Sequence, residues 1–432
     1  MQIKVKKDIT KPPAKLVETQ KDLGFVPSRI GREKLETELK AGAHISIVTV
    51  VDHLIELAYN LRASDIHIDP LSDEVRIRLR IDGVLQDEMP FPKNIHNEVI
   101  SRIKILAGLR TDEHQSAQDG RFRVNVEGRQ VDIRVSIVPT YHGENASLRL
   151  LADQAEEFSL DTLGFSKNNQ EKIIAAIRHS YGMVLVTGPT GSGKTTTLYT
   201  LVKMLNTKDV SIITIEDPIE YSINGINQIG VNARTGLTFA NGLRSILRQD
   251  PNIIMVGEIR DAETAGLAVN SALTGHLVLS TLHTNDAATT LPRLLDLKVE
   301  PYLIASTVNI AVGQRLVRRI CNFCKQELKI TPLDLKSLSE VIPSHVLGKN
   351  TVFYKGVGCE ECLNTGYRGR VGIHEVIVID STVREAILRK ATAMEIKQLA
   401  KQQGMITMIE DGFIKAREGI TTIEEILRTL HE

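Results

Sequence analysis

The segment Gly188-Pro-Thr-Gly-Ser-Gly-Lys-Thr195 constrains this chain more than any other feature, because it fits the phosphate-loop pattern G-x-x-x-x-G-K-[ST] at every fixed position. The apolar run Met183–Thr187 precedes it and predicts a buried parallel strand, and a helical pattern continues after it through Leu205. In such a strand–loop–helix unit, backbone N–H groups and the helix N-terminus bind phosphate oxygens. We therefore predict that the chain binds a nucleoside triphosphate.

The individual positions of this loop predict how the nucleotide is held. Lys194 is expected to reach the β- and γ-phosphates, and the Thr195 hydroxyl is expected to hold Mg²⁺. The glycines allow the backbone to approach the phosphates closely. The predicted nucleotide-binding residues of the loop are Gly188, Pro189, Thr190, Gly191, Ser192, Gly193, Lys194, Thr195 and Thr196.

Charge and hydropathy restrict the classes of partner. The chain has 432 residues, with 53 Lys and Arg against 53 Asp and Glu, so its net charge does not indicate a nucleic acid or an anionic membrane. No uninterrupted apolar run reaches the ~18 residues that span a bilayer. The charged first residues are not followed by the apolar segment of a secretory signal. We expect a cytosolic protein that contacts a membrane only through partners.

Composition shifts along the chain predict its domains. Residues 1–44, with Pro12, Pro13, Gly24 and Pro27, are expected to be a tail or a small docking element. A helical period followed by alternating strands and hairpin signals predicts an α+β domain over residues 45–152. Residues 153–160 are the expected linker. Residues 161–432 predict an α/β domain with a mainly parallel sheet, ending in helices over 380–432, and its expected strands are Met183–Thr187, Ile212–Ile215, Ile253–Val256 and Leu277–Ser280.

Carboxylates follow two of the predicted strands. Glu258 comes after the apolar run Ile253–Val256, where such a group orients the Mg²⁺ shell or the attacking water. Glu216, Asp217 and Glu220 follow another strand, and like charges grouped this tightly indicate that a cation faces them. We predict Glu220 as the water-activating base, with the other two in support, although the pattern leaves open which of the three acts.

Basic residues near these strands are candidates for the phosphate site. Arg244 and Arg248 are four positions apart and share a helical face, where they stabilise phosphate charge, pair with the carboxylates, or form a solvated stripe. His276 and His283 flank the strand Leu277–Thr281. Either histidine is a candidate sensor of the γ-phosphate, with an ordinary polar role as the alternative.

Four cysteines form two pairs of matching spacing. Cys321, Cys324, Cys359 and Cys362 make two C-x₂-C knuckles within residues 318–370, and four thiolates are the ligand set of a tetrahedral structural Zn²⁺ site. In a reducing compartment such pairs favour a metal over disulfides. A redox role would use a single C-x₂-C motif directly after a strand, whereas these two motifs lie in predicted loops. We predict a zinc ion that stabilises a small subdomain and takes no part in the chemistry.

The order of these motifs resembles that of the secretion ATPase superfamily. The phosphate loop, Ile215–Glu220, Leu247–Pro251 with Val256–Asp261, and Leu273–His276 with Ser280–Thr284 look like its Walker A motif, Asp box, Walker B motif and His box. Three further stretches, Ala63–Ile68, Arg78–Val84 and Gln118–Arg121, together with the cysteine pairs, resemble the branch that powers type II secretion and type IV pilus assembly. The similarity covers roughly residues 45–432.

This resemblance implies a homo-hexameric ATPase with a RecA-like C-terminal domain and a PAS-like N-terminal one. It implies that Glu258 is the Walker B carboxylate, that Glu220 is the base, and that Arg134 and Arg149 reach the phosphates from the N-terminal domain. It further implies work at the inner face of the cytoplasmic membrane with a platform protein and a cytoplasmic docking protein, and through them with pilins or pseudopilins. Residues 1–44 are too few for the family's additional docking domain, so the docking mode stays open.

Other engines of the superfamily set the alternatives. Pilus retraction and conjugative or DNA-uptake transport use similar motors, and a nucleotide-gated scaffold would bind ATP without turnover. The arginine face of the strand Val75–Ile81 has no interleaved aromatic residues to stack bases, which argues against a nucleic-acid groove.

Overall fold

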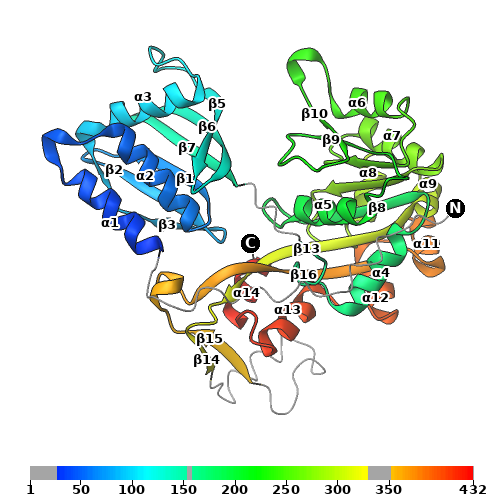
Figure 1. Cartoon of the computed structure of the whole chain (residues 1–432). Coiled ribbons are helices and arrows are strands. Elements are labelled where there is room, and N and C mark those ends of the chain that lie inside the picture. Colours follow the sequence, from blue (N-terminus) through cyan, green and yellow to red (C-terminus); the bar gives the residue numbers. More distant parts are fainter. Residues whose placement is uncertain (1–26, 153–157, 329–351, 432) are drawn as a thin grey trace. The chain divides into compact units, whose positions relative to one another are not determined.

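The computed structural model describes residues 27–152, 158–328 and 352–431 (Figure 1). The described residues up to Ala152 form one compact unit, and those from residue 158 onward form a second. Among the helices of the described ranges, none combines the length and the apolar character needed to cross a membrane.

The N-terminal unit is an antiparallel sheet with helices packed on one face. Its strands are ordered β3-β2-β1-β7-β6-β5, with β4 pairing to β2. Leu54, Ile66, Ile103 and Ile133 come from two helices and two strands and are buried in one common core. The α+β fold predicted for this part of the chain is confirmed. Its elements are α1 (Pro27–Leu39), η2 (Gly42–His44), α2 (Ile47–Asn60), β1 (Ala63–Pro70), β2 (Glu74–Ile81), β3 (Val84–Asp87), β4 (Phe91–Pro92), η3 (Lys93–Ile95), α3 (His96–Ala107), β5 (Gln118–Val126), β6 (Arg129–Thr140) and β7 (Gly143–Ala152).

Helix α1 was not expected from the sequence. It begins at Pro27, a residue well suited to a first helical turn because its missing N–H would be unpaired there in any case. Leu35 is fully buried in the core of this unit, and Arg32 forms an ion pair of 2.7 Å with Glu88. This part of the expected tail therefore belongs to the folded unit, whereas residues 1–26 lie outside the described ranges.

The second unit is an α/β domain with helices on both faces of its sheet. The strand order is β10-β9-β11-β12-β8-β13-β16, and every neighbouring pair is parallel except β13 with β16. Alternate residues of β8 enter different cores: Met183 and Leu185 pack with α6 and α7, and Val184 and Val186 pack with α4 and α5. The elements up to β12 are α4 (Lys167–Ile177), β8 (Gly182–Thr187), α5 (Lys194–Leu205), β9 (Ile212–Glu216), β10 (Asn227–Gly230), η4 (Ala233–Thr235), α6 (Phe239–Ile246), β11 (Ile253–Val256), α7 (Ala262–Leu273) and β12 (Leu277–Leu282).

The remaining elements build the far side of this unit. Strands β13 and β16 form a long hairpin, and the cysteine-containing insert extends from its tip. The helices predicted over residues 380–432 are present. These elements are α8 (Thr290–Asp296), α9 (Pro301–Thr307), β13 (Val308–Ile320), β14 (Lys325–Leu328), β15 (Phe353–Gly356), η5 (Glu360–Cys362), β16 (Tyr367–Val378), α11 (Ser381–Leu388), α12 (Ala393–Gln402), α13 (Met408–Arg417) and α14 (Ile423–His431).

Candidate active site and cysteine cluster

The parallel strands bring most of the predicted site residues to one edge of the sheet. Strands β8, β9, β11 and β12 run in the same direction, so the segments that follow them leave at the same edge. In open α/β sheets, ligands bind outside the carboxyl ends of the strands. The phosphate loop, the Glu216–Glu220 segment, Glu258 and His283 all lie there.

The glycines of the phosphate loop are required by its backbone. Gly188 has φ +150°, and a Cβ at this position would lie 2.2 Å from the carbonyl oxygen of Gln314. Gly191 and Gly193 have φ of +79° and +84°, a region that side chains disfavour. Helix α5 then begins directly at Lys194, so its N-terminal N–H groups face the loop.

Gln314 on β13 holds the phosphate loop through two hydrogen bonds. Its side-chain amide donates to the carbonyl of Ser192 at 2.7 Å, and its oxygen accepts from the Thr197 hydroxyl at 2.7 Å. Gln314 is buried, so both bonds are shielded from water. Sequence reasoning missed this residue, and the only signal was a glutamine within a largely apolar run.

The ammonium of Lys194 lies against the backbone of its own loop. The Lys194 ammonium donates to the carbonyls of Gly188 and Pro189, each at 2.9 Å. Burial lowers the pKa of Lys194, and the nearby charge of Glu258 opposes that shift. Thr195 is exposed at the loop surface, and the hydroxyl of Ser192 is buried without a hydrogen-bond partner among the described residues.

Glu258 lies in a small charged group beyond the end of β11. It accepts a hydrogen bond from Nε2 of His283 at 2.9 Å and forms an ion pair of 2.5 Å with Arg260. The hydrogen bond to Glu258 raises the pKa of Arg260, so this guanidinium stays charged. The structure thus brings His283 to the predicted Walker B carboxylate and adds Arg260, which sequence reasoning did not identify.

His276 is not brought to this edge within the chain. It precedes β12, and its carbonyl accepts from the N–H of Gly182 at the start of β8. Its ring lies 2.9 Å from the carbonyl of Ser271. Because a strand rises ~3.3 Å per residue, the length of β12 separates His276 from His283 by roughly 20 Å. The two flanking histidines therefore occupy opposite ends of the sheet.

The three carboxylates after β9 have different surroundings. Glu216 is 2% exposed and accepts hydrogen bonds from Thr214 at 2.6 Å, from Gln228 at 3.2 Å, and from the hydroxyl of Tyr199. Asp217 is exposed and Glu220 is half-buried. Glu216 therefore lies in the interior of the unit, whereas the other two carboxylates lie toward solvent.

The two predicted arginines of α6 have partners of their own. Arg244 forms an ion pair with Glu263, in the first turn of α7. Arg248 donates to the carbonyl of Arg244 at 2.9 Å and to the Ser245 hydroxyl at 3.2 Å. Both side chains lie at the exposed surface, so their predicted role at a phosphate stays a prediction.

The four cysteines lie together, as the spacing predicted. Their Sγ atoms are all within 4.8 Å of one another, with Cys321 to Cys359 and Cys324 to Cys362 each at 3.8 Å. Four sulfurs at ~2.3 Å from a tetrahedral Zn²⁺ lie roughly 3.8 Å apart, so this geometry fits the ion. Backbone N–H groups of Cys359 and Gly366 also donate to Sγ of Cys362, each at 3.2 Å, which favours the thiolate form.

The family model described as "Type II/IV secretion system protein" matches residues 40–428. The chain belongs to this family. Its curated relatives include a type IV pilus assembly ATPase, PilB, of Thermus thermophilus, 48% identical over 377 residues that cover 87% of this chain and 42% of the relative. They also include type II secretion system protein E of Xanthomonas campestris, 47% identical over 388 residues that cover 89% of this chain and 68% of the relative.

Solved structures share the fold of this secretion-family chain. The ATPase DotB of Legionella pneumophila has a TM-score of 0.63 at 25% identity, covering 88% of this chain and 95% of that one. The pilus retraction motor PilT, solved with bound ADP, has a TM-score of 0.60 at 26% identity, covering 88% and 96%. The RecA-like α/β fold predicted from the sequence is thereby confirmed.

In the N-terminal unit of this family member, the two predicted arginines stand in a row across the sheet. The register pairs Arg149 with Arg134 and with Asp65, and it extends the row to Arg121 and Arg80. Asp65 forms ion pairs with Arg149 at 2.9 Å and with Arg80 at 3.5 Å. Four guanidinium groups thus share a row with one carboxylate, so the row carries excess positive charge.

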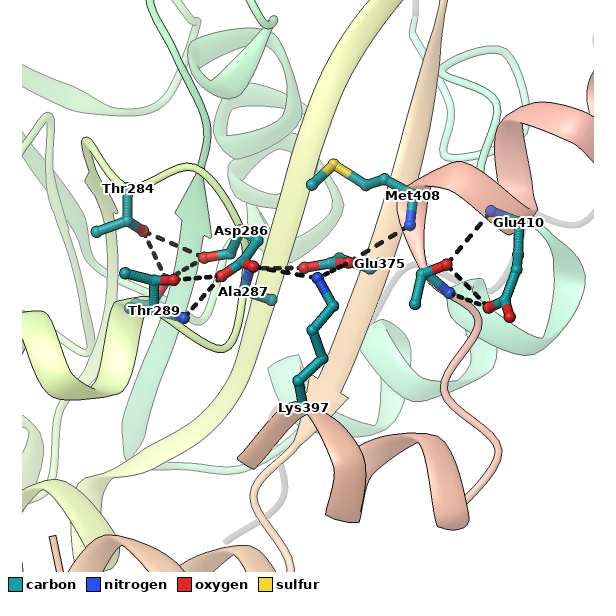
Figure 2. Close-up of polar contacts among 10 residues, drawn as sticks. Thr284, Asp286, Ala287, Thr289, Glu375, Lys397, Met408 and Glu410 are labelled. Carbon is teal, nitrogen blue, oxygen red and sulfur yellow. Dashed lines mark hydrogen bonds and ion pairs between the residues drawn. The ribbon is translucent and has the colours of Figure 1, made fainter. Parts of the chain in front are cut away.

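A polar network links the segment after β12 to the C-terminal helices of the second unit (Figure 2). Lys397 of α12 reaches between Asp286 at 3.1 Å and Glu375 at 3.7 Å. Glu375 is almost fully buried and accepts from the N–H of Ala287 at 2.9 Å. Burial disfavours the charged ammonium, but the attraction of both carboxylates outweighs it and raises the pKa of Lys397. The network fixes α12 against the loop that follows His283.

Proposed function

We propose that this chain is a hexameric ATPase motor that hydrolyses ATP to drive type IV pilus assembly or type II protein secretion. The observation that carries the proposal is the phosphate loop lying at one strand edge with Glu258 and the Glu220 segment. The chain spans 42% of the length of the Thermus relative, so the activity of the whole protein is part of the proposal. Curated relatives named for assembly or secretion at 40–48% identity favour these roles over retraction, since the retraction motor is 26% identical.

The residues of the site have distinct roles in this reaction. The backbone N–H groups of the loop and Lys194 bind the phosphates, and the hydroxyl of Ser192, which has no partner within the described part of the chain, is available for a phosphate oxygen. Lys194 exchanges its two carbonyl acceptors for phosphate oxygens. Thr195 and Glu258 would supply oxygen ligands to a Mg²⁺ ion, which would neutralise phosphate charge when bound. Glu220 orients and deprotonates the attacking water.

Arg134 and Arg149 of the N-terminal unit complete the site in this proposal. Their positively charged row supports binding of an anion, and an arginine finger contributes ~10³–10⁵ in rate. Because they belong to a separate unit, movement of that unit would switch hydrolysis on and off. In this proposal, the same movement drives pilus assembly or secretion.

The proposed setting follows from the same assignment. We place the hexamer at the inner face of the cytoplasmic membrane, where a platform protein and a cytoplasmic docking protein couple it to pilins or pseudopilins. The cysteine cluster holds a structural Zn²⁺ outside the reaction. A nucleic acid is not the expected substrate, so DNA should not stimulate turnover whereas the platform protein should.

A phosphate-release assay on Glu258→Gln tests the proposal. We expect the wild-type chain to hydrolyse ATP with Mg²⁺, and the variant to lose roughly 10²-fold or more in kcat because the Mg²⁺ site loses its charged ligand. Binding of a fluorescent ATP analogue should persist in the variant. An exposed carboxylate of the same unit, changed by Glu424→Gln, should leave kcat unaltered. ATP binding without wild-type turnover would instead identify a nucleotide-gated scaffold.

A further inference from the structure

A tyrosine on the helix of the phosphate loop holds the segment that carries Glu220. Tyr199 lies on α5, little more than one turn after Lys194, and its side chain is fully buried. Its hydroxyl donates to Glu216 and accepts from the backbone N–H of Glu220 at 3.3 Å. We propose that Tyr199 is a positioning residue that fixes Glu220 relative to the phosphate-binding helix. This inference rests on the proposed ATPase function, with Glu220 as the base.

The direction of each hydrogen bond around Tyr199 is determined by chemistry. The carboxylate of Glu216 only accepts, and its Oε1 already receives Thr214 at 2.6 Å and Gln228 at 3.2 Å. The single proton of the Tyr199 hydroxyl therefore points to Oε2 of Glu216. The oxygen lone pairs are left to accept from the Glu220 N–H, since the two amide protons of Gln228 are directed to Glu216 at 3.2 Å and to the carbonyl of Tyr221 at 3.1 Å.

Burial and the charge of Glu216 keep this proton on the tyrosine. Burial is the larger cause, and together with Glu216 it raises the pKa of Tyr199 far above neutral pH. The hydroxyl therefore stays protonated at neutral pH, and it acts there as both a donor and an acceptor. Glu216, which is nearly inaccessible to solvent, serves as the fixed anchor of the arrangement.

The rest of the segment closes around the same tyrosine. Gln228 accepts from the N–H of Ile223 at 2.7 Å and donates to the carbonyl of Tyr221 at 3.1 Å. The ring of Tyr221 packs edge-on against Tyr199, with centroids 4.7 Å apart and planes at 77°. A shift of α5 is therefore passed to Glu220 through direct contacts. Misplacement of a catalytic group by ~1 Å costs on the order of 10²-fold in rate.

Tyr199→Phe in the full chain tests this inference because it removes the hydroxyl and keeps the ring. We expect kcat for ATP hydrolysis to fall by roughly 10–100-fold, since Glu220 loses its anchor. The KM for ATP and the affinity for a fluorescent ATP analogue should stay unchanged, because the phosphate loop is not altered. Unchanged kcat in Tyr199→Phe would overturn the inference.

Thr214→Val is the matched control. It removes a different donor from the same buried carboxylate, and the described contacts of Thr214 do not include Tyr199 or Glu220. Both variants should lower Tm because each leaves Glu216 short of a donor. Only Tyr199→Phe should lower kcat. If both variants lose kcat in proportion to their loss of Tm, Tyr199 has a structural role only and the inference is wrong.

A double-mutant cycle with Glu220→Gln separates this inference from the proposed function. If Tyr199 acts through Glu220, Tyr199→Phe should remove no further activity from the Glu220→Gln chain. Losses that multiply, or a Glu220→Gln chain with normal turnover, would overturn the inference. A wild-type chain without ATP turnover would overturn the proposed function, whereas an active wild type with a fully active Tyr199→Phe would overturn only the positioning role.

Discussion

Gln314 shows how much of the phosphate loop depends on a residue outside its motif. Its two bonds satisfy the carbonyl of Ser192 and the hydroxyl of Thr197, which are both shielded from water. A buried polar group left without its partner costs ~1–3 kcal/mol. The shape of the loop is therefore set jointly by its glycines and by a strand that follows it much later in the chain.

At this residue we predict that Gln314→Leu weakens nucleotide binding. The KM for ATP should rise several-fold and Tm should fall, because the loop loses a donor and an acceptor at once. Steady-state kinetics and titration with a fluorescent ATP analogue measure both effects. Gln402→Leu, at an exposed position of α12, should change neither quantity. Wild-type affinity in Gln314→Leu would show that the loop keeps its shape without these two hydrogen bonds.

At the scale of elements, the strands that carry motifs were predictable and the long hairpin was not. The pattern of Met183–Thr187 gave β8 because its residues are all apolar or β-branched and all buried. Strand β16 contains His374 and Glu375, both almost fully buried, so polar residues interrupt its apolar pattern. Their surroundings come from residues distant in sequence, such as Lys397 and Phe165. Contacts between residues this far apart in the sequence cannot be predicted from the local pattern of β16.

For the cysteine cluster we predict that metal loss unfolds the insert before the rest of the second unit. Purified protein should contain one zinc per chain, and a chelator should make residues near β14 and β15 the first sites of limited proteolysis. Structural zinc contributes ~10–16 kcal/mol of apparent binding energy, which this small element would lose. Elemental analysis and proteolysis measure the two effects. In a Cys359→Ser, Cys362→Ser chain, the chelator should have no further effect.

Helix α14 gives a prediction for acid pH. Glu425 is 1% exposed and is held by Arg318 and Arg428, each at 2.7 Å. Burial alone would raise the pKa of Glu425, but the hydrogen bonds from these arginines outweigh it and lower the pKa to about 2. An unfolded glutamate has a pKa of ~4.3. The two ion pairs of Glu425 therefore stabilise the fold fully above pH ~4.3, and this stabilisation is lost as the pH falls toward 2.

The change Glu425→Gln should remove this dependence. We expect a lower Tm at pH 7, with a loss of roughly 3 kcal/mol in the free energy of unfolding. Between pH 4.5 and 2, the Tm of the variant should then fall less than the Tm of the wild type. Thermal melts across that range measure it. Glu424→Gln, one position earlier and exposed, should behave as the wild type. An equal acid response in both variants would contradict the prediction.

At the scale of the whole molecule, the sequence predicted two folded units but not the full extent of the first. The glycine and prolines of residues 1–44 favoured a tail over a helix. Leu35 is buried through contacts with residues later in the chain, and the local sequence does not show those contacts. The role of Arg134 and Arg149 is a further case. The register places them in one row, but the role proposed for them involves a nucleotide held by the second unit, and neither strand contains information about that unit.

The two arginines give the test at this scale. Arg134→Ala and Arg149→Ala should still form hexamers and bind ATP, but should hydrolyse it roughly 10³-fold more slowly, because the developing phosphate charge loses its counter-charge. Size-exclusion chromatography and phosphate release measure assembly and turnover. Arg123→Ala, an exposed arginine of β5 outside the row, is the control and should remain active. Normal hydrolysis by intact hexamers of either variant would rule out the finger role.

Strand β13 has a consequence for how this gene tolerates insertions and deletions. It carries Gln314 under the phosphate loop, and Cys321 directly follows its last residue, Ile320. Side chains alternate along a strand, so one codon added or lost between these positions would turn every later residue to the opposite face. Such a change would alter how the cysteine pairs are oriented relative to Gln314 and the phosphate loop. We therefore expect this short stretch to keep a constant length among functional versions of the protein.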